Sequence, residues 1–181
     1  MFYILLAHGF EEIEAFGTVD FLRRCGLEVK IASVEGVRSI TGAHGITVLT
    51  DCLVRQFNVI QSQGLILPGG MPGAEKLRDS MLVKKTVMAM AKRNKLVAAI
   101  CAAPMVLGVT GVLKDVRATC YPGFEPYLKG AIIEDALVVE DENFITAKGP
   151  GATIDFAAAI ARRFVSEKTV ENVKRGMIIG E

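Results

Sequence analysis

The 181-residue sequence contains no tryptophan, only two histidines and only four cysteines. The cysteines form no CxxC pair and show no metal-ligand spacing with either histidine, so we expect neither a metal site nor a disulfide framework. Reduced thiols are typical of a cytoplasmic protein. A cysteine without such a pattern is by default a small buried hydrophobic residue, and this default applies to Cys25, Cys52, Cys101 and Cys120.

Charge and hydropathy exclude two further classes of protein, those that bind nucleic acid and those that span a membrane. Lysine and arginine number 21 against 20 acidic residues, and no basic stripe with interleaved aromatics indicates nucleic-acid binding. The first seven residues lack the basic region of a signal peptide. Leu96–Val109 carries no charge, but Pro104 and Gly108 interrupt it and a spanning helix needs about 20 apolar residues. We therefore expect neither a nucleic-acid partner nor a membrane.

Hydrophobic residues make up 51% of the chain, enough for one substantial core, so we expect a single domain over residues 1–181. Apolar runs of strand length alternate with segments of helical period. The expected strands are Phe2–Ala7, Leu27–Ala32, Gly64–Leu67 and Leu96–Ile100, with hairpins over Gly36–Asp51 and Val138–Thr146. Helices are expected over Ile13–Gly26, Ser80–Arg93, Ala102–Val109 and Thr153–Val165. This alternation predicts an α/β fold, a mostly parallel sheet with helices on both faces.

The first expected helix follows an acidic segment. Its apolar residues step by three, which predicts one buried face formed by Ile13, Phe16, Val19 and Leu22. Glu11, Glu12 and Glu14 surround its start, where carboxylates suit the helix dipole and usually remain solvated. The alternative is that one of the three faces a reactive group in the core.

In such a sheet, ligands bind beyond the carboxyl ends of the strands. Cys101 stands there, at a strand-to-helix turn built from Ala102, Ala103 and Pro104. Free amides and the helix dipole favour a thiolate at such a turn and lower a thiol pKa from about 8.5 to roughly 3.5–7.5. Cys101 is therefore either a reactive nucleophile or a plain buried thiol.

A glycine pair follows the preceding strand. Gly69-Gly70 is either an ordinary turn or a place where the backbone N–H of Gly70, together with that of Ala102, forms an oxyanion hole beside Cys101.

Four motifs occur in one order along the chain: Leu5-Leu-Ala-His-Gly-Phe-Glu-Glu-Ile-Glu14, Leu67-Pro-Gly-Gly70, Ala98-Ala-Ile-Cys-Ala-Ala-Pro104 and Thr146-Ala-Lys-Gly-Pro-Gly151. Together they resemble the ThiJ/PfpI superfamily, most closely its branch of the parkinsonism-associated protein deglycase. The resemblance implies a flavodoxin-like three-layer sandwich, a homodimer and no cofactor. It also implies a nucleophilic Cys101, a protonated Glu14 bonded to its sulfur, and oxyanion amides at Gly70 and Ala102.

Two positions depart from the family pattern. Tyr121 stands where members often have a histidine, and Ala102 stands where the protease-like branch has one. A Cys-His hydrolase is therefore disfavoured. His44 matches a family position near the active site, and it either reaches the pocket or is a plain loop histidine.

The resemblance implies glyoxalase or deglycase chemistry on methylglyoxal-type 2-oxoaldehydes or on glycated protein. In this hypothesis Cys101 forms a hemithioacetal, Gly70 and Ala102 hold the oxyanion, and Glu14 moves the proton. The alternative is a non-catalytic oxidative-stress sensor or redox-regulated chaperone that uses oxidation of Cys101. In a third reading, a purely structural dimer module, Cys101 would be buried and inert.

Overall fold

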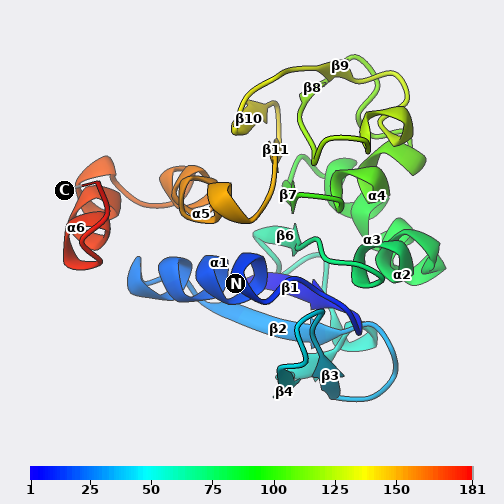
Figure 1. Ribbon diagram of the computed structural model, residues 1–181, viewed down its shortest axis with the longest axis horizontal. Coiled ribbons are helices and arrows are strands. Elements are labelled where there is room, and N and C mark those ends of the chain that lie inside the picture. Colours follow the sequence, from blue (N-terminus) through cyan, green and yellow to red (C-terminus); the bar gives the residue numbers. More distant parts are fainter. Residues whose placement is uncertain (181) are drawn as a thin grey trace.

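The computed structural model describes residues 1–180 and has a seven-stranded sheet at its centre (Figure 1). The strand order is β10-β11-β7-β6-β1-β2-β5. All neighbours in this sheet run parallel except β10 and β11, which form an antiparallel hairpin. The strands are β1 (Phe2–Leu6), β2 (Val29–Ser33), β5 (Cys52–Leu53), β6 (Gly64–Leu67), β7 (Leu96–Ile100), β10 (Val138–Asp141) and β11 (Phe144–Ala147). The expected mostly parallel sheet is confirmed.

Helices cover both faces of the sheet, because its central strands are apolar on both sides. Alternate residues of β1 enter two separate cores, with Phe2, Ile4 and Leu6 in one and Tyr3 and Leu5 in the other. The first core is covered by α1 (Glu12–Arg24), α5 (Thr153–Arg162) and α6 (Glu167–Gly176), and the second by α2 (Gly73–Asp79), α3 (Met81–Ala91) and α4 (Pro104–Val109). The result is the three-layer arrangement expected from the sequence (Figure 1).

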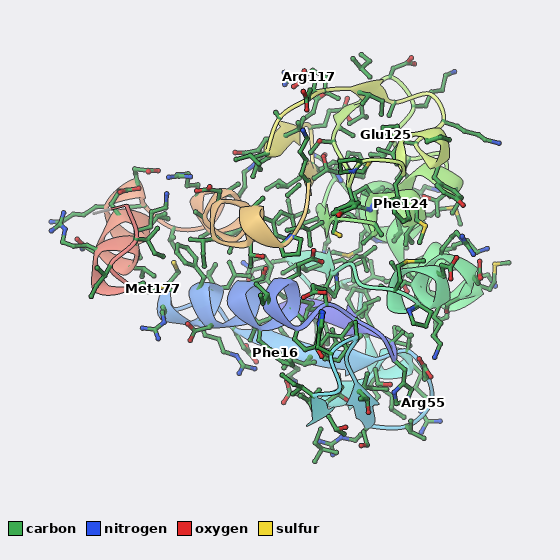
Figure 2. All side chains as sticks on the ribbon, viewed as in Figure 1. Phe16, Arg55, Arg117, Phe124, Glu125 and Met177 are labelled. Carbon is green, nitrogen blue, oxygen red and sulfur yellow. The ribbon has the colours of Figure 1, made fainter. Side chains whose placement is uncertain are left out.

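Partly buried side chains complete each core. Phe16 of α1 and Met177 after α6 pack against the first core, whereas Phe124 packs against the second (Figure 2). Phe124 belongs to the segment that follows β8 (Arg117–Ala118), a short strand that pairs in parallel with β9 (Ile132–Ile133).

A second hairpin, β3 (Ser39–Thr41) with β4 (Thr47–Leu49), lies beside the start of α1. The backbone N–H of Ala43 donates to the carbonyl of Phe10 at 2.8 Å and fastens the hairpin there. Both expected hairpins are therefore confirmed. Three single turns of 3-10 helix complete the fold: η1 (Val54–Gln56), η2 (Glu125–Tyr127) and η3 (Pro150–Ala152).

The expected buried face of α1 is wrong in part. Ile13 is 60% exposed, whereas Glu14, Ala15, Thr18, Val19 and Leu22 are buried. These five positions recur at i, i+1, i+4, i+5 and i+8, the spacing of a wide helical stripe; Glu12 and Phe21 are buried as well, and α1 packs against α5. The first turn of α1 is thus rotated about the helix axis by about one residue position from the expected orientation. This rotation places Glu14, and not Ile13, in the core.

The topology brings three loops together. The strand order reverses between β1 and β6, and doubly wound sheets bind ligands at such a switch point, beyond the carboxyl ends of the strands. His8, Gly69 and Cys101 follow β1, β6 and β7 at that end. Within residues 1–180 there is no helix with the length and hydropathy needed to cross a membrane.

Candidate active site

Cys101 occupies the turn between β7 and α4, as expected. Its φ is +64°, a left-handed conformation that is rare outside glycine and costs about 1–3 kcal/mol. Two backbone hydrogen bonds of 2.8 Å hold it there: Cys101 N–H donates to the Ala147 carbonyl, and Tyr121 N–H donates to the Cys101 carbonyl. Neighbouring segments thus impose a strained backbone on a partly buried cysteine, which is typical of a functional position.

Glu14 is fully buried on the first turn of α1. Its Oε2 accepts a 2.7 Å hydrogen bond from the Gly69 backbone amide. Its Oε1 is also buried and has no hydrogen-bond partner among residues 1–180. A buried carboxylate oxygen without a partner is costly, so this oxygen favours carrying a proton.

Gly69 separates the carboxyl of Glu14 from the thiol of Cys101. A Cβ atom placed on Gly69 would stand 2.8 Å from Glu14 Oε2 and 3.0 Å from Cys101 Sγ. Both atoms therefore border the same small space, which exists because residue 69 has no side chain. The sequence prediction that Glu14, among the three early acids, faces Cys101 agrees with this geometry.

The two groups perturb each other's titration. Burial raises the pKa of Glu14 to about 7, against the lowering effect of its hydrogen bonds to Cys101 and Gly69. Burial, then the charge of Glu14 and the hydrogen bond to it, raise the pKa of Cys101 to about 12. Near neutral pH the thiol therefore keeps its proton while Glu14 is about half protonated, so that an ionised carboxylate is available as a base beside a protonated thiol.

The expectation of a lowered thiol pKa at Cys101 is wrong for this structure. The helix that was expected to begin at Ala102 begins at Pro104 and has only six residues, so its dipole is small and displaced from the sulfur. Burial and the neighbouring carboxyl outweigh it. The thiol can lose its proton at neutral pH only if a neighbouring base takes it, and Glu14 is that neighbour.

Two backbone amides also act on the sulfur. The N–H groups of Ala102 and Gly70 lower the pKa of Cys101, although by less than burial raises it. Gly70 reaches this position with a φ of +85°, a conformation that suits glycine. The two residues expected to form an oxyanion hole therefore both present donors to the reacting atom.

Comparison with known proteins identifies the family of the chain. The model of the DJ-1/PfpI family matches residues 2–163. The chain belongs to the DJ-1/PfpI family. It is 33% identical over 178 residues to the protein dj-1beta of Drosophila melanogaster, covering 97% of this chain and 95% of that protein. It is 36% identical over 151 residues to a deglycase of Pyrococcus abyssi, covering 82% and 89% of the two chains.

Solved DJ-1 structures share the fold over nearly the whole chain. Oxidised DJ-1 of Toxoplasma gondii superposes with a TM-score of 0.94 at 31% identity, covering 99% of this chain and 98% of that one. A cysteine-to-alanine variant of a DJ-1 superfamily protein of Salmonella typhimurium gives a TM-score of 0.95 at 30% identity, with the same coverage.

In this DJ-1/PfpI chain His44 does not contact the thiol. It lies in the turn between β3 and β4 with a largely exposed ring, and its Nδ1 is 2.9 Å from Glu12 Oε2 and 3.7 Å from Glu11 Oε1. The hydrogen bond to Glu12, then the charge of Glu11, raise the pKa of His44. Of the two alternatives, the loop histidine is the one that the structure supports.

Glu12 is not the solvated residue that the sequence suggested. It is buried, and its Oε1 accepts a 2.8 Å hydrogen bond from the backbone N–H of His44 while its Oε2 contacts the imidazole. Glu12 thereby fastens the β3–β4 hairpin to α1. Sequence reasoning missed this because the partner is 32 residues away and no local pattern marks it.

Ligand atoms of Glu11, Glu12 and His44 lie within 4.8 Å of one another, which is close enough to bind a metal ion. Both carboxylate oxygens of Glu12 already bond to His44, one to its backbone N–H and the other to its imidazole, so they hold the β3–β4 hairpin in place. This group lies outside the contact between Glu14 and Cys101.

The backbone N–H of Tyr121 donates to the Cys101 carbonyl, and the ring of Tyr121 is half-exposed and lies over Gly149.

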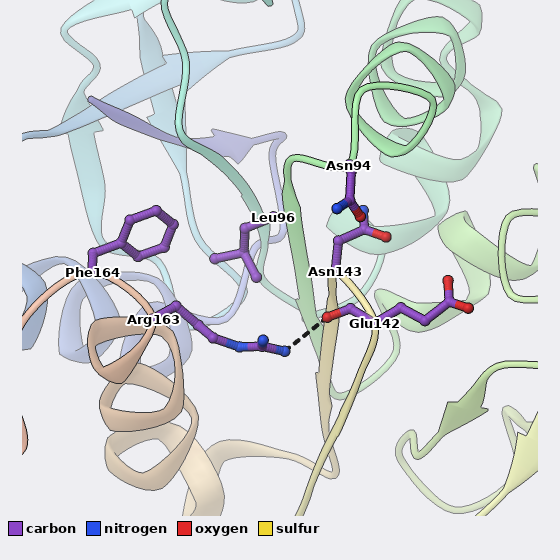
Figure 3. A pocket seen from close by; sticks show the side chains of 6 residues that line it. All are labelled: Asn94, Leu96, Glu142, Asn143, Arg163 and Phe164. Atoms are coloured by element: carbon purple, nitrogen blue, oxygen red, sulfur yellow. Dashed lines mark hydrogen bonds between the residues drawn. The ribbon is translucent and has the colours of Figure 1, made fainter.

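A separate hollow of about 640 Å³ lies at the opposite end of the sheet, where Arg163 donates to the Glu142 carbonyl at 2.8 Å (Figure 3). Leu96, the first residue of β7, lines that hollow, whereas Cys101 follows the last residue of β7. The hollow is therefore not part of the cysteine site.

Proposed function

We propose that this protein converts methylglyoxal-type 2-oxoaldehydes, or their adducts on proteins, through a hemithioacetal on Cys101 and without a cofactor. The observation that carries the proposal concerns the buried carboxyl of Glu14. One of its oxygens has no hydrogen-bond partner among residues 1–180, and only Gly69, which has no side chain, lies between this carboxyl and the thiol. A carboxyl with a pKa of about 7 can both accept and return a proton at neutral pH. The resemblance to an archaeal deglycase supports the same class of substrate.

The first step forms the carbon–sulfur bond. Glu14 takes the thiol proton while the sulfur of Cys101 attacks the aldehyde carbon, and the electron pair of the carbonyl moves to its oxygen. The amides of Gly70 and Ala102 stabilise that oxyanion. Glu14 then returns the proton to the oxygen, which leaves a neutral hemithioacetal and an ionised carboxylate.

The second step moves hydrogen between the two carbons. The Glu14 carboxylate removes the proton on the sulfur-bearing carbon, the electron pair forms a double bond to the neighbouring carbon, and the electron pair of the ketone moves to its oxygen, which gives an enediolate. Glu14 returns that proton to the neighbouring carbon, and the hydroxyl proton of the sulfur-bearing carbon passes to the enediolate oxygen, which gives a 2-hydroxy thioester. Water then cleaves the thioester, so that one water is consumed, a 2-hydroxy acid leaves and the thiol is restored.

A redox sensor is the second candidate, and the same amides favour it. Two equivalents of peroxide would convert the Cys101 thiol to a sulfinate with release of two waters. Donors from Gly70 and Ala102 and a proton on Glu14 could then hold the sulfinate oxygens. This candidate needs an accessible thiol but no proton transfer to carbon.

Lactate formation from methylglyoxal tests the proposal. We expect turnover by the unmodified protein, its loss in Cys101→Ser, and its retention in Cys120→Ser, a matched control because burial likewise raises the pKa of Cys120 to about 12. Equal turnover by Cys101→Ser would refute the proposal. Peroxide oxidation of Cys101 in a protein that forms no lactate would instead favour the sensor.

A further inference from the structure

An apolar hollow of about 200 Å³ is lined by segments that hydrogen-bond to the backbone of Cys101. Its wall has two main parts, one from the segment after β8 and one from the turn between β11 and α5, and Leu137, just before β10, completes it. The residues that form the two parts are Tyr121, Pro122, Gly149, Pro150, Gly151 and Ala152.

Both parts of the wall are fastened to the cysteine itself. Tyr121 N–H donates to the Cys101 carbonyl, and Cys101 N–H donates to the carbonyl of Ala147, two residues before Gly149. Ala152 and Cys101 also belong to the same core. The hollow therefore keeps a fixed position relative to the reacting residue.

The ring of Tyr121 forms the aromatic side of the hollow. It stacks edge-on against Phe124, with the ring centroids 6.5 Å apart. A Cβ atom on Gly149 would stand 3.2 Å from Tyr121 Cδ2, so the ring lies directly over this glycine. The φ of Gly149 is 171°, which any residue adopts, so glycine here provides room and not an unusual backbone.

The lining of the hollow has few polar groups that would bind a charged ligand. Lys148 also borders the hollow, but its ammonium is paired with Asp135. An engineered apolar cavity of about 150 Å³ is enough to bind benzene. The size and the lining therefore suit a flat hydrocarbon ring.

We propose that this hollow binds the substituent on the ketone carbon of the substrate and that Tyr121 makes the site selective for aryl 2-oxoaldehydes over methylglyoxal. The proposal rests on the proposed function and names the substrate class of the same site. Stacking on Tyr121 stabilises an aryl group both before and during attack by the sulfur of Cys101. A methyl substituent is too small to reach the ring, so its conversion does not depend on Tyr121.

The ratio of kcat/KM for phenylglyoxal to that for methylglyoxal tests the selectivity. We expect Tyr121→Ala to lower this ratio about threefold to tenfold, the usual range for one aromatic contact, because it removes the ring on which only the aryl substrate stacks. Tyr127→Ala is the matched control, because Tyr127 is similarly exposed and does not line the hollow. An unchanged ratio in Tyr121→Ala, or an equal fall for both substrates, would overturn the proposal.

A second readout does not require turnover. Cys101 is alkylated with 2-chloroacetophenone or with chloroacetone, which differ only in phenyl against methyl, and each rate is divided by that of glutathione. We expect a preference for the aryl reagent that Tyr121→Ala removes and Tyr127→Ala keeps. If neither aldehyde is converted, the proposed function fails, and this alkylation ratio alone decides whether the hollow selects aryl groups.

A third variant narrows the hollow while it keeps the ring of Tyr121. Gly149→Ala places a methyl group against Tyr121, so we expect it to lower the aryl preference in both assays. Circular dichroism and the melting temperature verify that the variant is folded. A folded Gly149→Ala protein with an unchanged aryl preference would place the ring-binding surface elsewhere.

Discussion

The backbone amide of Gly69 donates a 2.7 Å hydrogen bond to Oε2 of Glu14, and no side chain separates this carboxyl from the thiol of Cys101. Gly69→Ala should drive the two groups apart, because the added methyl would stand 2.7 Å from Cys101 Cβ. Displacement of reacting groups by about 1 Å costs roughly 100-fold in rate. We therefore expect a loss of that size in kcat/KM for methylglyoxal, measured beside the melting temperature. A folded Gly69→Ala protein with full turnover would contradict this geometry.

Glu14 should make the stability of the protein fall as pH rises. Its pKa is about 7 in the folded protein against 4.5 ordinarily, so the folded state binds the proton more tightly. That contribution is present in full below the unfolded value and is lost as pH rises through the folded value. Between pH 5 and pH 8 the loss in the free energy of unfolding is roughly 2–3 kcal/mol.

Urea denaturation of the unmodified protein and of Glu14→Gln at the two pH values measures this difference. All other titratable groups are common to both proteins, so the difference between the two proteins isolates Glu14. We expect the glutamine variant to lose less stability over this interval. Equal losses in both proteins would show that Glu14 titrates at its ordinary pKa.

We propose that the chain forms a twofold dimer through the start of α1 and the β3–β4 hairpin. Ile13 and Ile46 are both exposed there, and the backbone N–H of Ile46 lies 3.4 Å from Glu12 Oε1, so the two isoleucines belong to adjoining segments. Large exposed apolar side chains that gather on one surface are typical of protein interfaces.

Light scattering at micromolar concentration should show a dimer for the unmodified protein and a monomer for Ile13→Asp. Ile60→Asp is the control, because Ile60 is also exposed but lies in the loop before β6, away from this surface. A monomeric unmodified protein would contradict the proposal, and so would a dimer that Ile13→Asp leaves intact.

The sequence predicted the layered sheet and the position of Cys101 because both depend on local signals. Apolar runs of strand length predicted β1, β6 and β7, and small residues followed by Pro104 predicted the turn that holds the thiol. It did not predict α2, which has only seven residues and too few turns for a visible period. Nor did it predict α6, which buries only Val170 and has Val173 as its one other large apolar side chain.

The electrostatics of the site could not be obtained from local patterns. The pKa of Cys101 depends on how deeply the sulfur is buried and on the carboxyl of Glu14, 87 positions earlier in the chain. The burial of Glu12 likewise depends on the distant turn that contains His44. Residue type and spacing indicated which groups to expect near one another, whereas packing decides which of them keep a proton.

Substitution of Glu14 by glutamine separates proton transfer at Cys101 from hydrogen bonding to its sulfur. The amide of Glu14→Gln can still donate a hydrogen bond to the sulfur, but it can neither accept nor return a proton. General acid–base catalysis contributes typically 10²–10⁴-fold, so we expect lactate formation from methylglyoxal to fall by about that factor. Oxidation of Cys101 by peroxide, followed by mass spectrometry in the same preparation, should change little. Full turnover by Glu14→Gln would contradict the account and favour the redox sensor over the enzyme.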